Sequence, residues 1–204
     1  MKLFYDKLVA LTLIDYPERQ EYIEYVLKEN NLKYELLLSK KHDKPLIGCL
    51  NAHINAIKYA KSLNLDTIMI CEDDIIIKDT FKDCDIPLEW DMIFFGGILS
   101  NIRFQIPGWI LGTFWCAHAY VIKSTLFDFI LDIYNTLDLN EMHDNGKTID
   151  WLYTTYVMPK FNCWLKEDQS IIQKPGKSLL TNIDKWGNDW DWDTYSIKDL
   201  SKTH

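Results

Sequence analysis

The chain has 204 residues, of which 48% are hydrophobic and 14% aromatic, and its formal net charge is -8, from 22 basic and 30 acidic side chains. This length and apolar content predict a single packed domain over residues 1–204. The negative charge repels phosphate backbones and anionic membranes, so nucleic acid is excluded as a favoured partner. An anionic small ligand stays compatible, because a bound metal ion reverses the field inside one cleft.

The cysteines and the first apolar segment bear on the cellular compartment. The five cysteines are odd in number and show no Cys-x-x-Cys spacing, which favours reduced, buried thiols. The apolar run at residues 8–14 is far shorter than the roughly 20 residues that span a bilayer, so no membrane span is predicted. No cleavage site follows it, and we expect a cytoplasmic protein, in the host cytoplasm if the source is a virus. The oligomeric state stays open, a homo-oligomer included.

The first third of the chain alternates strand and helix patterns. Short apolar runs predict buried strands at residues 9–14, 34–38 and 67–71. Apolar residues at helical spacing predict a helix that begins at Pro17 and a second helix at residues 47–63. This βαβαβ order predicts an α/β fold with a mostly parallel central sheet flanked by helices.

Later elements are predicted from weaker patterns. Strands are expected at residues 92–95, 115–122 and 162–165, with a Gly- and Pro-punctuated segment between the first two. Ser124 has the position of an N-cap for a helix, and a further helix is expected to begin near Thr148. Regular patterns fade after Lys166.

An acidic cluster follows the third predicted strand. Glu72, Asp73 and Asp74 come directly after it, at the edge of a parallel sheet where ligands bind. Alternation predicts that Glu72 and Asp74 share a cleft while Asp73 points elsewhere. Two converging carboxylates without a Lys or Arg between them favour a hard cation, Mg²⁺ or Mn²⁺. The alternative is a solvated acidic loop.

Several blocks in collinear order resemble the family 25 glycosyltransferases, the lipooligosaccharide and collagen galactosyltransferase relatives. The resemblance covers roughly residues 8–183 and leaves residues 184–204 as an aromatic and acidic C-terminal segment. The matching blocks are Leu13 with Pro17-Glu18-Arg19, Gly48-Cys49 with Ala52-His53, Glu72-Asp73-Asp74, Phe95-Gly96-Gly97, His118 to Ile122, Ile149-Asp150, and Gln173 with Ser178.

The resemblance implies a GT-A (Rossmann-like) fold and a metal-dependent hexosyltransferase that inverts the anomeric centre. The implied donor is a UDP-hexose or UDP-N-acetylhexosamine, the implied acceptor a hydroxyl of a glycan or glycoprotein, and the implied cofactor Mn²⁺ or Mg²⁺. Asp74 and Glu72 are the implied metal ligands. The predicted nucleotide-sugar-binding residues are Thr12, Leu13, Arg19, His53, Glu72, Asp73, Gly97, His118 and Lys174.

The chain also departs from the family pattern. Ala52 stands where the family has a serine, and Lys174 stands where a histidine is expected after Gln173. Lys174 retains a positive point charge that suits a diphosphate. His53 lies on or beside a buried helical stripe, so a core histidine is an equal alternative to a ligand-binding one.

Two carboxylates are candidates for the base that takes the acceptor proton. Asp150 is the first, with a helix-capping role as its alternative. Asp191 is the second and lies in the alternating segment Asp189-Trp190-Asp191-Trp192-Asp193. The indole rings of this segment suit binding of sugars, although packing of the indoles onto the domain is an alternative.

Two other function classes remain open at this point. A nucleotidyltransferase would bind the same ion, but its Gly- and basic-rich phosphate loop is missing from the sequence. A non-catalytic nucleotide-sugar- or sugar-binding domain of the same fold would keep the cleft without turnover.

Overall fold

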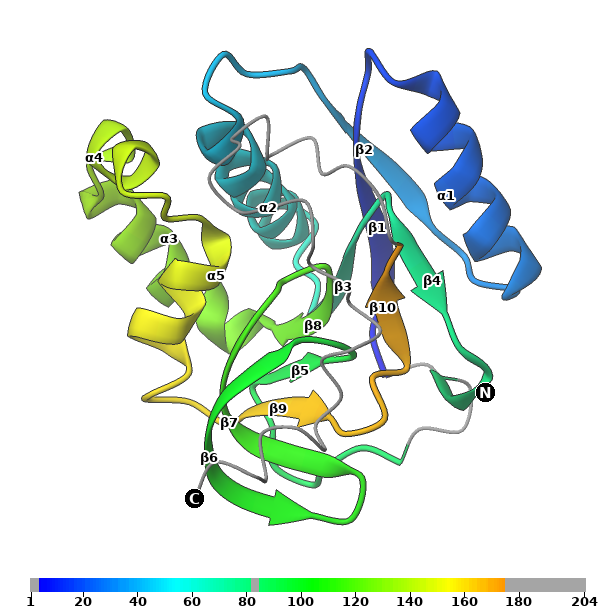
Figure 1. The fold of residues 1–204 in the computed structure, drawn as a ribbon, viewed down its shortest axis with the longest axis vertical. Coiled ribbons are helices and arrows are strands. Elements are labelled where there is room, and N and C mark those ends of the chain that lie inside the picture. The colour runs from blue at the N-terminus through cyan, green and yellow to red at the C-terminus, as the bar shows by residue number, and fades with distance from the viewer. Residues whose placement is uncertain (1–3, 82–84, 175–204) are drawn as a thin grey trace.

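The computed structural model describes residues 4–81 and 85–174. It shows a large twisted sheet with helices on both of its faces (Figure 1). The described strands form an eight-stranded sheet of order β2-β1-β3-β8-β5-β9-β7-β6 and a two-stranded sheet of β10 and β4. The predicted α/β class is confirmed.

The strands are β1 (Lys7–Leu13), β2 (Glu35–Ser39), β3 (Thr67–Glu72), β4 (Ile75–Ile77), β5 (Met92–Phe94), β6 (Ile98–Ile106), β7 (Trp109–Trp115), β8 (Ala119–Lys123), β9 (Cys163–Lys166) and β10 (Ile171–Gln173). The helices are α1 (Pro17–Glu29), α2 (Pro45–Ser62), α3 (Phe127–Thr136), α4 (Leu139–Asp144) and α5 (Ile149–Leu152). Single 3₁₀ turns lie at Asp79–Phe81 and Ser124–Leu126, and a π-helical turn at Tyr153–Val157 follows α5.

The pairing of the strands divides the large sheet into two parts. Strands β2, β1 and β3 are parallel, as the βαβαβ pattern predicts. β8 then runs antiparallel to both β3 and β5, and β7 is antiparallel to β6 and β9. The parallel part is therefore the part that the first three strands build, and the rest of the sheet is mixed.

Alternation along the strands creates a hydrophobic core on each face of the sheet. Val9 and Ile70 point into a core that α2, α3 and α5 cover. Their neighbours Ala10 and Met69 point into a second core that α1 covers. Figure 1 shows α2 and α1 on opposite sides of β1 accordingly. Burial on both faces explains why these strands read as continuous apolar runs.

Proline and asparagine set the limits of the first two helices. Pro17 and Pro45 occupy the first helical positions, where a missing backbone N–H leaves no helical bond unmade. Asn31 and Asn64 follow the two helices with φ of 56° and 52°, the left-handed conformation that asparagine tolerates. These ends agree with the predicted helices within two residues.

The predicted strand at residues 115–122 was wrong in its extent. The segment is split between the end of β7 and β8, because Cys116 has φ of 81° and breaks the extended backbone. The Gly- and Pro-punctuated segment before it forms the hairpin of β6 and β7, with Gly108 at φ of 79° in the turn. The Pro107-Gly108 pair was therefore a hairpin signal.

Four further elements differ from the sequence-based expectation. Ser124 makes no side-chain cap hydrogen bond and begins a 3₁₀ turn, from which α3 continues. Helix α4 was not predicted, and it is capped by the Asp138 carboxylate, which accepts from the backbone N–H groups of Asn140 and Glu141. β4 and β10 were also missed because each has only three residues.

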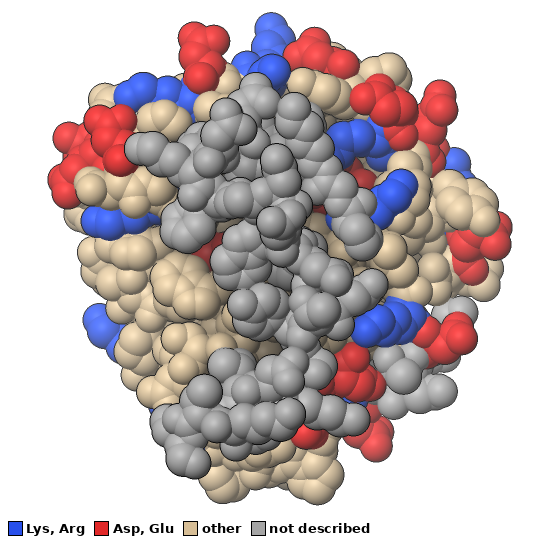
Figure 2. All heavy atoms as spheres, in the orientation of Figure 1, with Lys and Arg blue, Asp and Glu red and all other residues tan. Residues whose placement is uncertain are grey.

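The described helices include none that is long and apolar enough to cross a membrane. On the face in Figure 2, basic and acidic side chains are interspersed around the rim of the molecule. The excess of acidic residues is therefore not concentrated in one acidic patch on the visible part of this face.

Candidate active site

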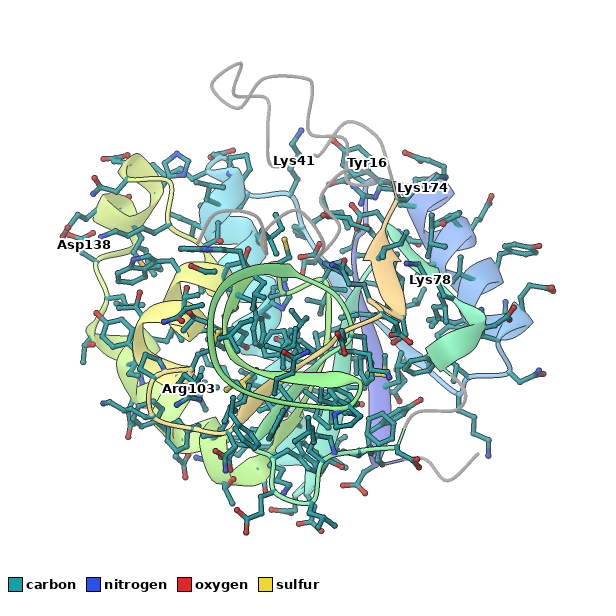
Figure 3. All side chains as sticks on the ribbon, turned by 60° about the horizontal axis from the view of Figure 1, so that its bottom comes forward. Tyr16, Lys41, Lys78, Arg103, Asp138 and Lys174 are labelled. Atoms are coloured by element: carbon teal, nitrogen blue, oxygen red, sulfur yellow. The ribbon has the colours of Figure 1, made fainter. Side chains whose placement is uncertain are left out.

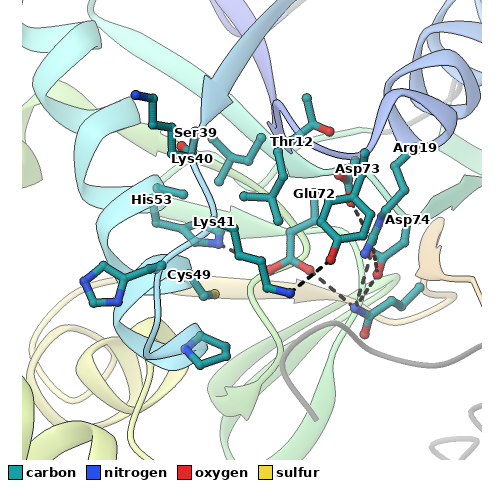
Figure 4. Close-up of a pocket in the computed structure, with 18 residues that line it drawn as sticks. Thr12, Arg19, Ser39, Lys40, Lys41, Cys49, His53, Glu72, Asp73 and Asp74 are labelled. Atoms are coloured by element: carbon teal, nitrogen blue, oxygen red, sulfur yellow. Dashed lines mark hydrogen bonds and ion pairs between the residues drawn. The ribbon is translucent and has the colours of Figure 1, made fainter. Parts of the chain in front are cut away.

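A cleft of about 810 Å³, including the part open to solvent, lies at the carboxyl ends of the three parallel strands. The register aligns these ends, with Leu13 opposite Ser39 and Leu11 opposite Glu72. The N-terminal parts of α1 and α2 and Gln173 of β10 complete the wall (Figure 4). The cleft thus has the location that parallel α/β sheets give to ligand sites.

The acidic turn faces this cleft with an arginine in contact. The Arg19 guanidinium lies 2.5 Å from Asp73 Oδ1 and 2.8 Å from Asp74 Oδ2. The sequence did not predict this contact, in which Arg19 partly neutralises the acidic turn. Pro17 starts α1 at the end of β1, which places Arg19 in the first turn and over the strand ends. The ion pairs offset the unfavourable position of a cation at a helix N-terminus.

Glu72 and Asp74 converge on a single donor. The Gln173 side-chain nitrogen lies 3.3 Å from Glu72 Oε2 and 3.3 Å from each carboxylate oxygen of Asp74. This contact agrees with the expected shared orientation of the two acids. Asp73 also lines the cleft, since residues 73 and 74 form a turn rather than an extended strand. Only part of the alternation argument therefore applies.

The acids lie in an environment that disfavours their charge. Burial, and then repulsion by Asp74, raise the pKa of Glu72 to about 8. Burial also raises the pKa of Asp73. Among the described residues, these three carboxylates and the Arg19 guanidinium give a formal charge of -2 when all are ionised. A divalent cation would balance that charge.

His53 connects Glu72 to the protein core. Its Nε2 lies 3.3 Å from Glu72 Oε1, its Nδ1 lies 3.0 Å from the Tyr120 hydroxyl, and that hydroxyl lies 2.9 Å from the Tyr153 hydroxyl. Burial lowers the pKa of His53 to about 4, so the ring is neutral near pH 7. The histidine is therefore buried and also faces the site, which combines both alternatives that the sequence left open.

Asp150 lies in the first turn of α5, beside this group but outside the lining of the cleft. Burial, and then repulsion by Glu72, raise its pKa to about 6. Backbone N–H groups of Cys116 and Ala117 favour its ionised form. The left-handed backbone of Cys116 thus lies where two strands part and a carboxylate approaches, and such conformations cluster at functional sites.

The other predicted residues divide into two groups. Thr12 and Leu13 line the cleft, whereas Gly97, His118 and Lys174 are not among its lining residues. His118 Nε2 lies 3.0 Å from the Ile171 carbonyl and so holds β10. Lys174 Nζ lies 4.0 Å from the centre of the Tyr22 ring, and its backbone N–H donates to the Asp74 carbonyl. Asp191 and Ser178, with the Trp-rich segment 189–193, lie outside the described residues.

Sequence reasoning missed the end of β2 as a part of the site. Ser39, Lys40 and Lys41 line the cleft. Lys41 donates to the Tyr16 hydroxyl at 3.2 Å, and Figure 3 shows the two side chains together at one end of the molecule. The strand-end rule that selected Glu72 applies equally to β2, so this polar loop was predictable as a wall of the cleft.

Comparison with known proteins gives a family match over part of the chain and a similar fold. Residues 14–87 match the family described as glycosyltransferase family 25 (LPS biosynthesis protein). No curated protein matches the sequence significantly. A glycosyltransferase involved in glycosylation of the major capsid of PBCV-1 is similar in structure, with a TM-score of 0.50 at 10% identity, over 84% of this chain and 94% of that one.

Two further structures are more distant. GlyE, a glycosyltransferase of Streptococcus pneumoniae TIGR4, has a TM-score of 0.46 at 13% identity, over 79% of this chain and 45% of that one. The inositol-1-phosphate CTP transferase of T. maritima has a TM-score of 0.45 at 12% identity, over 83% of this chain and 71% of that one.

The fold is that of the GT-A glycosyltransferases. The predicted enzyme class, a glycosyltransferase, agrees with the family match over residues 14–87. The predicted resemblance to family 25 is confirmed over residues 14–87. This segment contains Arg19, helix α2 and the Glu72-Asp73-Asp74 turn, which form most of the cleft.

Proposed function

We propose that the protein transfers a hexose or N-acetylhexosamine from a UDP-sugar to a hydroxyl of a glycan or glycoprotein, with inversion and with a divalent cation. The observation that carries this proposal is the convergence of Glu72 and Asp74 on one position at the end of β3, inside a cleft that also contains Arg19. Carboxylates in such a place repel a diphosphate unless a cation lies between the carboxylates and the phosphate oxygens.

The donor set fits a hard cation. The Gln173 amide nitrogen is a donor held by three carboxylate oxygens at 3.3 Å, which is the arrangement that a cation would replace after a side-chain shift. Carboxylate oxygens are the ligands that Mg²⁺ and Mn²⁺ prefer. We therefore assign Glu72 and Asp74 as the holders of the ion, which would neutralise charge on the departing diphosphate.

The polar wall opposite the acids suits the nucleotide. Thr12 and Leu13 close the end of β1, and Lys40 and Lys41 extend from the end of β2. A lysine ammonium can bind phosphate oxygens as a point charge. The Tyr16 ring next to Lys41 offers a flat surface on which the nucleobase of the donor can stack. Arg19 stabilises the acidic turn and becomes available to phosphate when the cation takes over Asp74.

Asp150 is our candidate base for the acceptor hydroxyl. Its pKa is raised to about 6, so the carboxylate is a stronger base than an exposed aspartate. At pH 7 it is still largely ionised and can accept a proton. It belongs to α5, which contacts α2, and it lies close enough to Glu72 and His53 for their charges to affect its pKa. A base so placed would remove the acceptor proton while the diphosphate leaves on the nucleotide side.

The test combines donor binding and turnover. The purified chain is mixed with Mn²⁺ and a panel of UDP- and GDP-sugars, and release of nucleoside diphosphate is measured beside metal-dependent donor binding by calorimetry. We expect release from one donor, and a drop of about a hundredfold or more in Asp74→Asn because the ion loses a ligand. Asp132→Asn, an exposed acid on α3, is the matched control and should retain full activity.

Other outcomes separate the rival functions. Pyrophosphate release from a nucleoside triphosphate and a sugar phosphate would identify a nucleotidyltransferase. Tight donor binding without turnover, with a panel of acceptors present, would identify a binding domain. Absence of metal-dependent binding for every donor would refute the proposal.

A further inference from the structure

The two carboxylate oxygens of Glu72 face two different sets of ligands. Oε2 faces the Gln173 amide nitrogen, which also contacts both carboxylate oxygens of Asp74, so the metal ligands offered on this side are carboxylate oxygens. Oε1 lies 3.3 Å from His53 Nε2, and the Cys49 sulfur, the His53 ring nitrogen and a Glu72 oxygen all lie within 4.8 Å of one another. A sulfur, a nitrogen and an oxygen donor thus meet beside the all-oxygen group.

The spacing of the donors is compatible with a tetrahedral metal site after a small adjustment. Bond lengths around zinc imply separations of about 3.3 Å between nitrogen and oxygen ligands and about 3.6 Å from sulfur to either. The contact of His53 with Glu72 already has the first value, 3.3 Å. The thiol is within 4.8 Å, so a change of about 1 Å closes the site, which a side-chain adjustment can supply.

Helix α2 presents the two softer donors together. Cys49 and His53 are four residues apart and therefore lie one above the other on one side of the helix. Figure 4 shows that this side faces Glu72. Cys49 is half-buried and lines the cleft, so a metal ion has a path to its sulfur.

The surroundings of His53 already contain the outer contact that metal-bound histidines need. Its Nδ1 lies 3.0 Å from the Tyr120 hydroxyl, which in turn contacts Tyr153 at 2.9 Å. With a metal on Nε2, Nδ1–H donates to Tyr120, and Tyr120 donates to Tyr153. Such a partner fixes the tautomer and ring orientation and strengthens binding.

We propose that Cys49 Sγ, His53 Nε2 and Glu72 Oε1 form a second metal site that takes Zn²⁺, distinct from the all-oxygen site of Glu72 and Asp74. Zinc accepts mixed sulfur, nitrogen and oxygen ligands, whereas Mg²⁺ and Mn²⁺ favour oxygen. On binding, the Cys49 thiol releases its proton to solvent and the sulfur bonds to zinc, with no change of oxidation state. The fourth position of the ion would be open to the cleft, which Cys49, His53 and Glu72 all line.

This site has a consequence that rests on the proposed transferase function. The two ions would share one carboxylate, so two dications would lie close together and repel each other. Zinc should therefore inhibit Mn²⁺-dependent turnover, and Cys49→Ser should be inhibited less. The binding itself is tested without any turnover, so its failure and the failure of the transferase proposal are distinguishable.

The first experiment titrates the full chain with Co²⁺, which reports four-coordination and thiolate ligation by its absorption. We expect a thiolate-to-cobalt band that saturates at one ion per chain and disappears when Zn²⁺ is added. Cys116→Ser is the matched control, because Cys116 is also a half-buried free thiol but is outside the three-ligand group. It should retain the band, and Cys49→Ser should lose it.

A second measurement keeps the test decisive if Cys49→Ser folds poorly. The wild-type chain is alkylated with iodoacetamide with and without Zn²⁺, and each cysteine is followed by peptide mass spectrometry. Zinc should slow alkylation of Cys49 about tenfold or more and leave Cys116 unchanged, while Tyr120→Phe should weaken zinc binding about tenfold. No cobalt–thiolate band in the wild type, or zinc protection of another cysteine in place of Cys49, would overturn the proposal.

Discussion

Arg19 is the residue on which the acidic turn most depends. It contacts Asp73, whose side chain is only 9% exposed, as well as Asp74. Removing one partner of a buried pair leaves a carboxylate without compensation. We expect Arg19→Ala to lower the free energy of unfolding by about 2 kcal/mol, below the value for a fully buried pair because Arg19 is 20% exposed and partly screened. Urea unfolding without divalent cation measures it.

A double-mutant cycle provides the control for this prediction. In Arg19→Ala combined with Asp73→Asn, the orphaned charge is absent, so part of the lost stability should return. Equal losses in the single and the double variant would show that Arg19 acts by packing of its alkyl chain rather than by its charge.

The hydroxyl chain behind His53 gives a second prediction at this scale. Tyr120→Phe removes the partner of both His53 Nδ1 and the Tyr153 hydroxyl, whereas Tyr153→Phe leaves the contact of Tyr120 with His53 in place. A buried polar group without a partner costs more than one lost hydrogen bond. We expect losses of about 3 kcal/mol for Tyr120→Phe and about 1 kcal/mol for Tyr153→Phe in urea unfolding. A larger loss for Tyr153→Phe than for Tyr120→Phe would contradict this series of hydrogen bonds.

Individual residues of the site were predictable where a strand end placed them. Glu72, Asp73 and Asp74 follow an unmistakable apolar run, so their location came from the pattern alone. The ion pair of Arg19 was not predictable in the same way, because it depends on where α1 packs relative to the end of β3. Gln173 was proposed only by resemblance, since β10 is too short to show a period.

At the scale of elements, β10 depends on close backbone contacts. A Cβ on Gly96 would lie 2.1 Å from the Ile171 carbonyl oxygen and 2.7 Å from His118 Nε2. Gly96→Ala should therefore push β10 away and lower stability by about 2 kcal/mol, within the usual cost of overpacking. Because Gln173 belongs to β10, this shift would also break its contacts with Glu72 and Asp74.

Amide hydrogen exchange tests this local effect. We expect faster exchange at Ile171, whose N–H donates to Phe95 at 3.1 Å, with unchanged exchange at the central amides of β1 as the internal reference. Uniformly faster exchange throughout the described chain would indicate global destabilisation instead.

The elements themselves were predicted unequally. The strands and helices of the parallel part follow long apolar periods, and β1, α1, β2, α2 and β3 agree with the sequence within about two residues. The β6–β7 hairpin was missed because its outer strand β6 is largely exposed and carries few buried residues to form a period. Tertiary pairing, rather than local pattern, determines such a strand.

For the molecule as a whole, the site joins distant parts of the chain. Residues from β1 near the N-terminus to β10 at Gln173 meet at one end of the sheet, and α5 brings Asp150 to the same group. The fold class was predictable because βαβαβ order restricts the topology. The meeting of α5 with β3 was not, because it depends on the mixed half of the sheet.

The buried acids make the stability of the molecule depend on pH in a defined direction. The pKa of Asp150 is raised by burial from 3.8 to about 6, so the native state binds more protons than the unfolded state between those values. The contribution of Asp150 is therefore fully present below pH 4 and is lost as the pH rises to about 6. Asp150→Asn removes this loss. We expect the free energy of unfolding of the variant to exceed that of the wild type by about 2 kcal/mol at pH 8 and to equal it near pH 4.

The same substitution should have the opposite effect on turnover. If Asp150 is the base, wild-type kcat/KM falls about tenfold per unit below pH 6, and Asp150→Asn loses about a thousandfold in kcat at every pH. Urea unfolding at pH 4 and 8, with the transferase assay on the same samples, measures both. A variant that is more stable at pH 8 yet inactive fits a catalytic base whose buried carboxylate destabilises the fold, since active sites commonly sacrifice stability for function. A more stable and fully active variant would mean that another carboxylate is the base.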